Sequence, residues 1–363
     1  MTLGVLFSYL SRSFLFWLLS VFLSLAGLFE IFDLVELLRR SSGKEGLTFA
    51  IVLQMNLLKL PHLIQDIFPF IMLFGALICF WRLAKSNELV VIRAAGISAW
   101  QILFPTLVIA FLVGILQITT YSSLAASLRS KYEALEAKYL ASQRNELAIS
   151  KTGLWLRQSH QDGQAVIHSN RLSANGRNME QVVVYLFDTS GKFHARIDAE
   201  EAALRSNYWE LINAVHSDLQ GKTERFDRYA LPTNLTMEKI QESFSSPDTL
   251  SFWELPEFIK ALDEAGFDSS AHRLRFHSML STPILFCAMV LIAAIFSFGA
   301  SRRASTSYMI LGGITSGFLL YLLTNVVHAL GLTTNIPVAL AAWMPAGVSV
   351  MLGVTALLHM EDG

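Results

Sequence analysis

The chain has 363 residues, of which 53% are hydrophobic and 16% are charged, and its formal net charge is −1. Because average soluble domains carry about 25% charged residues, this composition favours a membrane protein over a soluble one. A net charge so near zero excludes a whole-chain attraction to nucleic acid, and no basic run or nucleic-acid motif stands out in the sequence.

Six apolar runs are long enough to cross about 30 Å of hydrocarbon as helices. Three lie at 14–38, 63–81 and 97–121, and three lie at 279–298, 308–330 and 336–358. The first is also compatible with a signal peptide, because Ser24-Leu25-Ala26 has the spacing of a cleavage site, but its apolar stretch is too long and more spans follow. Both cysteines, Cys79 and Cys287, fall inside apolar runs, which argues against a disulfide or a metal site.

The region between the two triplets has a different character. A hairpin is predicted from an apolar segment at 181–187, a turn at 188–191 and an alternating segment at 192–197. Further strand-like segments at 153–157, 164–172, 208–217 and 223–229 indicate a β-sandwich or jelly roll. Helices are expected at 124–147, leaving the membrane, and at 250–265, closed by Gly266.

The predicted fold is therefore a membrane α-helical protein with six transmembrane helices, arranged three plus three around an inserted β-jellyroll-like domain. We expect residues 1–124 to hold the first three helices, 125–272 the β domain with its flanking helices, and 273–363 the last three helices. A short helix at about 86–96 belongs to the first region.

Motifs for catalysis are missing from the sequence. Gly221-Lys222-Thr223 resembles the end of a phosphate loop, but the required earlier glycine is His216. No HExxH, CxxC or GxSxG motif occurs, and the histidines of the β region, His160, His168, His194 and His216, are scattered. We predict no catalytic residue and no metal site in this chain.

The segment RLAKSNELVVIRAAG at 82–96 separates two predicted spans and reads as a short helix. Ser86 is a plausible N-cap, Glu88 lies in the first turn where the helix dipole favours an acid, and Gly96 can end the helix. Since its side chains are apolar nearly all round, the helix should be buried against something. It is either a tight connection packed on the chain's own spans or a coupling helix that docks on a separate subunit.

Residues 59–98, KLPHLIQDIFPFIMLFGALICFWRLAKSNELVVIRAAGIS, resemble the second span and coupling helix of the lipopolysaccharide export permeases, the LptF/LptG family. The segments DLVELLRRSSGKEG at 33–46, GLWLRQ at 153–158, and GFLLYLL and LAAWMP near the C-terminus resemble the LptG branch more than the LptF branch. The resemblance covers nearly the whole chain.

This resemblance implies a non-catalytic permease subunit of an ATP-driven transporter in the bacterial inner membrane. The implied partners are an LptF-type subunit, a cytoplasmic LptB-type ATPase dimer, and LptC-type and LptA-type components of a periplasmic bridge. The substrate is lipopolysaccharide, no cofactor is bound by this chain, and ATP and Mg²⁺ belong to the ATPase. By the same resemblance the coupling residues are Glu88, Ser86, Leu89, Ile92 and Arg93.

Lipopolysaccharide carries phosphates and acyl chains, so its site should combine an apolar cavity with cations. The resemblance assigns Arg39, Arg40, Glu30 and Asp33 to this site, and the alternative for Arg39 and Arg40 is ordinary anchoring of a span end at the interface. Glu30 departs from family members that carry a lysine at a matching position. Its partner on another helix cannot be named from the sequence.

The orientation is expected to place both termini in the cytoplasm and the β domain in the periplasm. The charge bias opposes it, because six cations flank the cytoplasmic side and nine flank the other, so the orientation rests on the resemblance. A mechanotransmitting or lipoprotein-handling membrane subunit remains the alternative function, and a signalling receptor is disfavoured because only five residues follow the last span.

Overall fold

The computed structural model describes residues 2–42, 47–140, 146–150, 153–160, 163–172, 178–188, 192–205, 208–218, 222–233, 246–264, 268–298, 306–333 and 336–362. The chain forms two compact units. The helical unit comprises Met1–Leu140, Asp248–Trp253 and Ser270–Gly363, and the β unit comprises Ala141–Pro247 and Glu254–Ser269. The hairpin turn residues 189–191 and the predicted cytoplasmic cations Arg302 and Arg303 lie outside the described residues.

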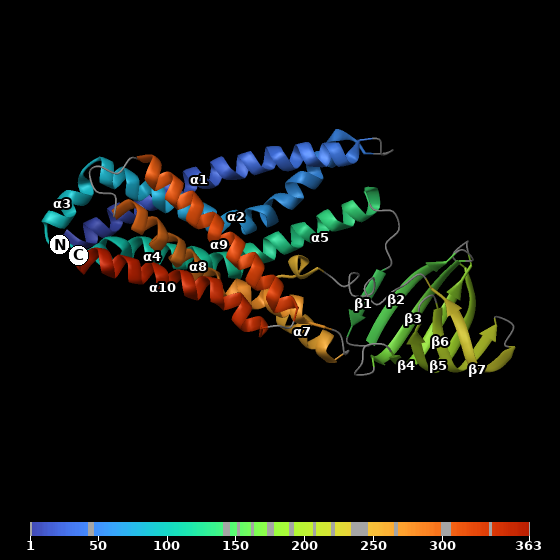
Figure 1. Ribbon diagram of the computed structural model, residues 1–363. Helices are drawn as coiled ribbons and strands as arrows, with labels where there is room; N and C mark the ends of the chain where they lie inside the picture. The colour runs from blue at the N-terminus through green and yellow to red at the C-terminus, as the bar shows by residue number, and fades with distance from the viewer. Residues whose placement is uncertain are drawn as a thin grey trace. The chain divides into compact units, whose positions relative to one another are not determined.

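Long helices make up the helical unit (Figure 1). In chain order they are α1 (Thr2–Ser41), α2 (Phe49–Lys85), α3 (Glu88–Ala94), α4 (Ala99–Leu116), the π-helix η1 (Gln117–Tyr121), α5 (Ser122–Tyr139), α8 (Ser270–Phe298), α9 (Thr306–Leu332) and α10 (Val338–Asp362). A single 3₁₀ turn, η2 (Pro247–Thr249), also belongs to this unit.

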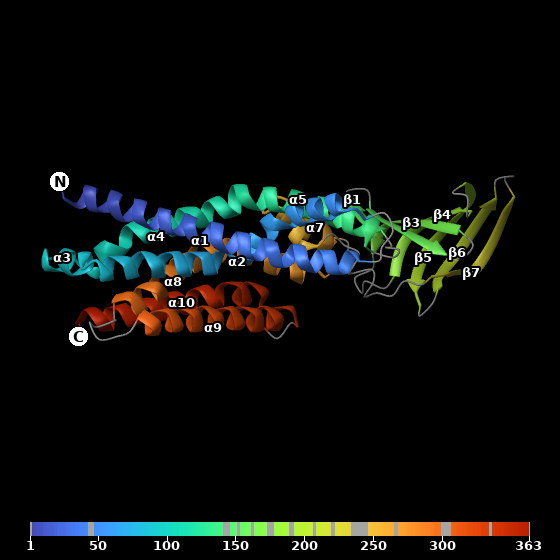
Figure 2. The same ribbon diagram turned by 90° about the horizontal axis from the view of Figure 1, so that it is seen from above.

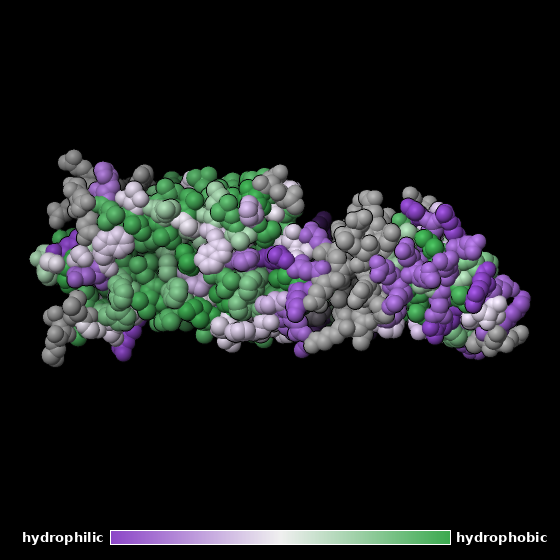
Figure 3. All heavy atoms as spheres, turned by 90° about the horizontal axis from the view of Figure 1, so that it is seen from below, coloured by the Kyte–Doolittle hydropathy of each residue, from purple (hydrophilic) through white to green (hydrophobic). Residues whose placement is uncertain are grey.

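Within the described part of the chain, six helical segments are long and apolar enough to cross a membrane: Gly4–Ser41, Phe49–Lys85, Ala99–Glu136, Ser270–Phe298, Ile310–Leu332 and Val338–Met360. They confirm the prediction of three spans, an insertion and three more spans. Figure 3 shows apolar side chains spread broadly over the helical unit on one face, as expected for a surface in contact with lipid.

A buried apolar core joins these helices. It contains Leu10 of α1, Phe80 of α2, Phe286 of α8, Leu320 of α9 and Leu357 of α10. The helices approach closely where side chains are small: a Cβ added at Gly114 of α4 would lie 2.5 Å from the Cα of Pro283 in α8. Both chain termini and α3 lie at the same end of this unit, as Figures 1 and 2 show.

The helix that follows α4 is interrupted by a π-type turn at η1. Ser122 N–H bonds the carbonyl of Gln117, five residues earlier. The neighbouring helix α2 contains Pro61 and Pro69, and each proline leaves a carbonyl one turn earlier without its usual helical donor. The hydroxyl of Tyr121 donates to Pro61 O over 3.0 Å, which ties η1 to α2.

The described strands of the β unit form one antiparallel sheet of seven strands in the order of the sequence. They are β1 (Glu146–Ser150), β2 (Gly153–His160), β3 (Gly163–Leu172), β4 (Asn178–Phe187), β5 (Phe193–Leu204), β6 (Tyr208–Asp218) and β7 (Thr223–Pro232). The predicted hairpin is confirmed, since Phe187 pairs with Phe193 and Asp188 N–H bonds Lys192 O.

The inserted β domain is thus confirmed, but its strand order differs from the expected jelly roll. A jelly roll places strands beside partners that are distant in sequence, whereas each described strand here pairs only with its sequence neighbours. The apolar face of the sheet contains Val184, Ile197 and Leu211, and Leu262 and Phe258 of helix α7 (Leu255–Glu264) belong to the same apolar cluster.

Candidate functional site

Helix α3 joins two spans at the end of the helical unit that also holds both termini (Figure 1). It ends in a Schellman motif: Gly96 has φ +82°, its N–H bonds Arg93 O, and Ile97 N–H bonds Ile92 O. The prediction that Gly96 ends the helix is confirmed. The predicted N-cap is wrong, because Asn87 with φ 60° occupies that position and Ser86 instead ends α2.

The short helix has an inner face and an outer face. Leu89 is only 7% exposed, and it joins the apolar core together with the half-buried Ile92. Val90 and Val91, by contrast, are 50% and 68% exposed. Arg93 lies over the ring of Phe298, 5.5 Å from its centroid. Leu89 and Ile92 therefore pack on the chain's own spans, and Val90, Val91 and Arg93 form the surface that a second protein can reach. We call these three residues the outer face of α3.

Glu88, the first residue of α3, is bound from two directions. The Tyr9 hydroxyl of α1 donates to its Oε2 over 2.7 Å, and the Ser86 hydroxyl donates to its Oε1 over 2.8 Å. The hydrogen bond from Tyr9 is the main cause that lowers the pKa of Glu88, helped by Ser86 and the charge of Arg82 against partial desolvation. Neutral hydroxyl donors hold this carboxylate in its ionised form, so its negative charge is not cancelled by a bound cation.

The two arginines at the other end of α1 point to different partners. Arg39 makes a bidentate pair with Glu36 of the same helix at 2.9 Å, and its side chain is 76% exposed. Arg40 reaches α5 and donates to Glu136 Oε1 over 3.0 Å. The predicted basic pair is thus present, but each cation already has a carboxylate partner within the chain.

Glu30 and Asp33 lie one turn apart on the inner side of α1. The amide of Asn56 in α2 donates to Glu30 Oε1 over 2.7 Å, which answers the question of the partner of Glu30. Asp33 pairs with Lys59 of α2, and both side chains are largely buried. One carboxylate oxygen of each acid is buried without a hydrogen-bond partner. These two acids fasten α1 to α2.

The predicted residues therefore form two separate groups. Glu88, Ser86, Leu89, Ile92 and Arg93 gather around α3, whereas Glu30, Asp33, Arg39 and Arg40 lie toward the opposite end of α1. From Tyr9 to Arg39 the helix rises about 45 Å at 1.5 Å per residue. The chain connects the two groups through one continuous helix.

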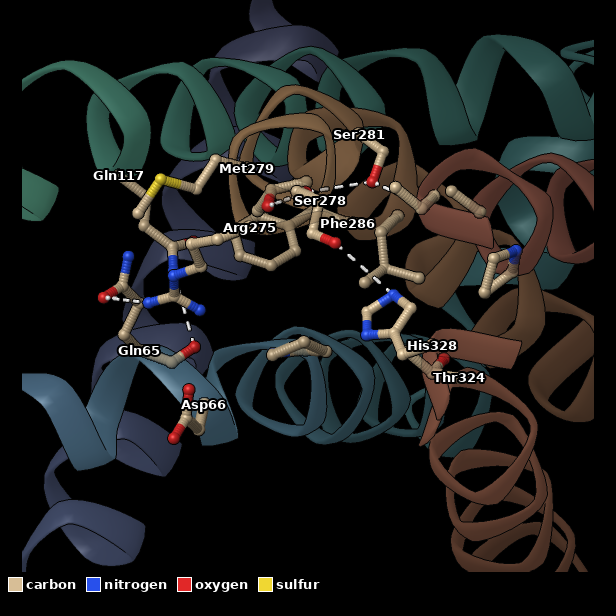
Figure 4. A pocket seen from close by; sticks show the side chains of 16 residues that line it. Gln65, Asp66, Gln117, Arg275, Ser278, Met279, Ser281, Phe286, Thr324 and His328 are labelled. Atoms are coloured by element: carbon tan, nitrogen blue, oxygen red, sulfur yellow. Dashed lines mark hydrogen bonds between the residues drawn. The ribbon is translucent and has the colours of Figure 1, made fainter. Parts of the chain in front are cut away.

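A polar pocket of about 170 Å³ inside the helical unit was not predicted from the sequence. It lies between α2, η1, α8, α9 and α10 (Figure 4). Its polar lining includes Gln65 and Asp66 of α2, Gln117 of η1, Arg275 of α8 and His328 of α9. The signal in the sequence was the Gln65-Asp66 pair between two prolines inside an otherwise apolar run.

No three His, Cys, Asp or Glu side chains among the described residues are grouped so that they could hold a metal ion. The six candidate spans and the β sheet inserted between the third and the fourth define a multi-pass membrane protein with an inserted extramembrane β domain. The spans carry few charges, and those described here are mostly paired with neighbouring side chains.

Comparison with known proteins identifies the family. The model of the family described as lipopolysaccharide export system permease LptF/LptG matches residues 8–359, and the chain belongs to this family. It is 25% identical over 363 residues to the lipopolysaccharide export system permease protein LptG of Escherichia coli strain K12, covering 98% of both chains. It is 27% identical over 351 residues to the LptG protein of Haemophilus influenzae, covering 93% of this chain and 94% of the relative. The resemblance to the LptG branch is thereby confirmed.

Proposed function

We propose that this chain is the LptG-type permease subunit of an ATP-driven transporter, which extracts lipopolysaccharide from the inner membrane and passes it to a periplasmic bridge. The family match over residues 8–359 carries this proposal. The chain would pair with an LptF-type subunit, and LptC-type and LptA-type proteins would receive the lipid. ATP and Mg²⁺ would be bound by an LptB-type ATPase dimer, and no cofactor by this chain.

The outer face of α3 is the surface we assign to the ATPase. Two features support this assignment: Val90 and Val91 are exposed although apolar, and the adjoining Glu88 keeps an uncancelled negative charge. A partner that covers the valines and places a cation or backbone N–H groups near Glu88 would complement both features. In this assignment α3 and both termini face the cytoplasm.

Two substitutions within α3 separate docking from packing. Val91→Asp places a charge on the outer face, and we expect the ATPase that copurifies with the permease to fall about tenfold or more, a change of 1.4 kcal/mol or more. Leu89→Ala instead creates a cavity beside the core and should lower the free energy of unfolding of the permease by about 2 to 5 kcal/mol. If Val91→Asp copurifies normally and Leu89→Ala alone has an effect, α3 is only a connection between spans.

The substrate contacts are assigned to the end of α1 that carries Arg39 and Arg40. Lipid phosphates could exchange with Glu36 and Glu136 as partners of these arginines, because charge-assisted bonds to phosphate are strong and bidentate. Replacing both arginines with Glu should weaken lipopolysaccharide-stimulated ATP hydrolysis in the reconstituted complex. Each lost contact should reduce the binding free energy of the lipid by about 1 to 3 kcal/mol. Basal hydrolysis should survive, and unchanged stimulation would reduce the pair to membrane anchors.

The orientation can be tested independently of transport. In a variant without Cys79 and Cys287, single cysteines at Ala95, beside α3, and at Lys222, in the β unit, should respond oppositely to an impermeant thiol reagent in cells with a permeabilised outer membrane. Labelling at 222 with protection at 95 is expected. The reverse pattern would overturn both the orientation and the assignment of α3 to a cytoplasmic ATPase.

A further inference from the structure

The pocket in the helical unit contains opposite charges that are not paired with each other. Arg275 lies on α8 and Asp66 on α2, and both line the cavity (Figure 4). The ion-pair contact of Asp66 among the described residues is with His62, at 3.8 Å, and the Asp66 side chain is 55% exposed. Ionisable side chains in membrane-spanning helices are rare and usually functional, and the long contact with His62 leaves Asp66 able to bind a polar group from outside the chain.

Two buried polar atoms of the lining lack hydrogen-bond partners, and they are of opposite kinds. Gln117 is only 5% exposed; its Nε2 donates to Gln65 O, but its Oε1 accepts nothing. Arg275 donates through Nη2 to Gln65 Oε1, and its Nε forms an ion pair with Asp248 Oδ1 at 3.4 Å but makes no hydrogen bond. The pocket therefore offers an unused acceptor, Gln117 Oε1, and a guanidinium N–H of Arg275 that is ion-paired with Asp248 but makes no hydrogen bond.

The position of the pocket matches the level of lipid headgroups. Asp66 lies 19 residues before Lys85, the last residue of α2, which places it about 28 Å along α2 from the end that carries α3. Since the hydrocarbon of a bilayer is about 30 Å thick, the pocket lies near the boundary on the side away from α3. Its volume of about 170 Å³ is below the roughly 300 to 1,000 Å³ of pockets that enclose drug-sized ligands. It has room for a headgroup, not for a whole lipid.

We propose that this pocket binds a phosphoethanolamine group, with the phosphate on Arg275 and the ammonium on Asp66 and Gln117. The phosphate accepts a hydrogen bond from Arg275 Nε, and the ammonium donates to the Asp66 carboxylate and to Gln117 Oε1. The hydroxyl of Ser278, 3.4 Å from His328 Nε2, lies on the other wall of the pocket. Apolar side chains such as Met279, Leu285 and Phe286 complete the lining. This site is separate from the residues proposed to contact lipopolysaccharide and does not depend on the proposed export function.

Phosphoethanolamine can reach the site as the headgroup of phosphatidylethanolamine or as the free compound. Native mass spectrometry of the purified complex, titrated with phosphatidylethanolamine, phosphatidylglycerol or free phosphoethanolamine, distinguishes the sources. We expect phosphatidylethanolamine to bind about tenfold more tightly than phosphatidylglycerol, because only the former presents an ammonium group. Binding of the free compound with the same dependence on Asp66 would identify the soluble source, and binding of the lipid alone would identify the membrane.

Asp66→Asn is the main variant, since it keeps the shape of a half-exposed side chain and removes only its charge. It should abolish the preference for phosphatidylethanolamine, an affinity loss of about tenfold, while the thermal stability stays at the wild-type value. Asp198→Asn, the same change at a half-exposed carboxylate of β5 outside the pocket, is the matched control and should change nothing. Arg275→Lys keeps the charge but loses the Nε donor, and should weaken binding of both phospholipids.

Three results would overturn the proposal. They are equal binding of the two phospholipids to the wild-type protein, an unchanged preference in Asp66→Asn, and an equal loss in Asp198→Asn. In the first two cases the pocket holds only water, which can satisfy the same donor and acceptor.

Discussion

The acidic side chains near the two ends of α1 are held differently: Glu88 belongs to α3 and contacts α1, and Asp33 belongs to α1 itself. Near α3, Glu88 is held by the hydroxyls of Tyr9 and Ser86, so its negative charge remains at an accessible surface. At the other end, Asp33 is paired with Lys59 between α1 and α2, and its charge is cancelled inside the protein. A carboxylate held by neutral donors can still attract a partner, whereas one paired with a buried cation mainly joins helices. The comparison supports the proposed recognition role of Glu88, whereas Asp33 joins α1 to α2.

The largest expected effect comes from breaking the buried pair. Lys59→Met leaves Asp33 with an uncompensated buried charge, which should lower the free energy of unfolding by about 3 to 5 kcal/mol. Thermal unfolding of the detergent-solubilised permease measures this loss. The exposed Arg39–Glu36 pair is the control, since Arg39→Ala should cost about 0 to 1 kcal/mol. Equal losses from the two variants would remove the distinction between a fastening pair and a surface pair.

A charge reversal at Glu88 should affect assembly more than stability. Glu88→Lys removes the acceptor of Tyr9 and Ser86 and places a cation where the proposed ATPase is expected to supply donors. We expect copurified ATPase and ATP-driven lipid release to fall about tenfold or more, or 1.4 kcal/mol or more, while the permease pair still folds and inserts. Wild-type assembly and release would show that Glu88 is not an essential contact, and a permease that fails to fold would show that α3 only packs on its own spans.

The smallest effect concerns the hydrogen bond from Tyr9. Tyr9→Phe should lower the free energy of unfolding by at most about 1.5 kcal/mol, because the site is partly exposed. It should also raise the pKa of Glu88 toward its ordinary value of 4.5. Because the folded-state pKa is lowered, the stabilisation is present at neutral pH and is lost as the pH falls through that lowered value. The difference in melting temperature between wild type and Tyr9→Phe should therefore shrink on acidification. Ser86→Ala should show the same trend more weakly, and a difference that is constant with pH would exclude this role for Tyr9.

The sequence was sufficient for the parts of the fold that depend on apolar length and local turn chemistry. Runs of about twenty apolar residues located the six spans found in the described part of the chain, and Gly96 marked the end of α3 because its positive φ favours glycine. The N-cap was missed because a Ser two residues before an acid fits the usual pattern, yet here Asn87 adopts the left-handed conformation and the Ser86 hydroxyl turns back to Arg82 O and to Glu88.

Contacts between distant elements could not be predicted in this way. The Asn56–Glu30 bond and the Arg40–Glu136 pair depend on the relative rotation of long helices, which apolar composition leaves unspecified because the spans are apolar nearly all round. The strand order of the β unit could not be predicted either, because alternation identifies strands without indicating which strands pair. The pocket combines residues from five helical elements and is visible only once these are packed.

Helix α1 contains no proline along its 40 residues, in contrast to α2 with Pro61 and Pro69. It therefore acts as a stiff rod about 60 Å long, roughly twice the thickness of the hydrocarbon layer. Tyr9 near one end touches Glu88, and Asp33 near the other is fixed to Lys59. A tilt of a few degrees about a point near α3 would displace the arginine-bearing end by several ångströms, whereas a helix interrupted by proline would absorb much of that motion by bending. The rigid helix α1 would in this way transmit a movement of α3 to the far membrane boundary without any local unfolding.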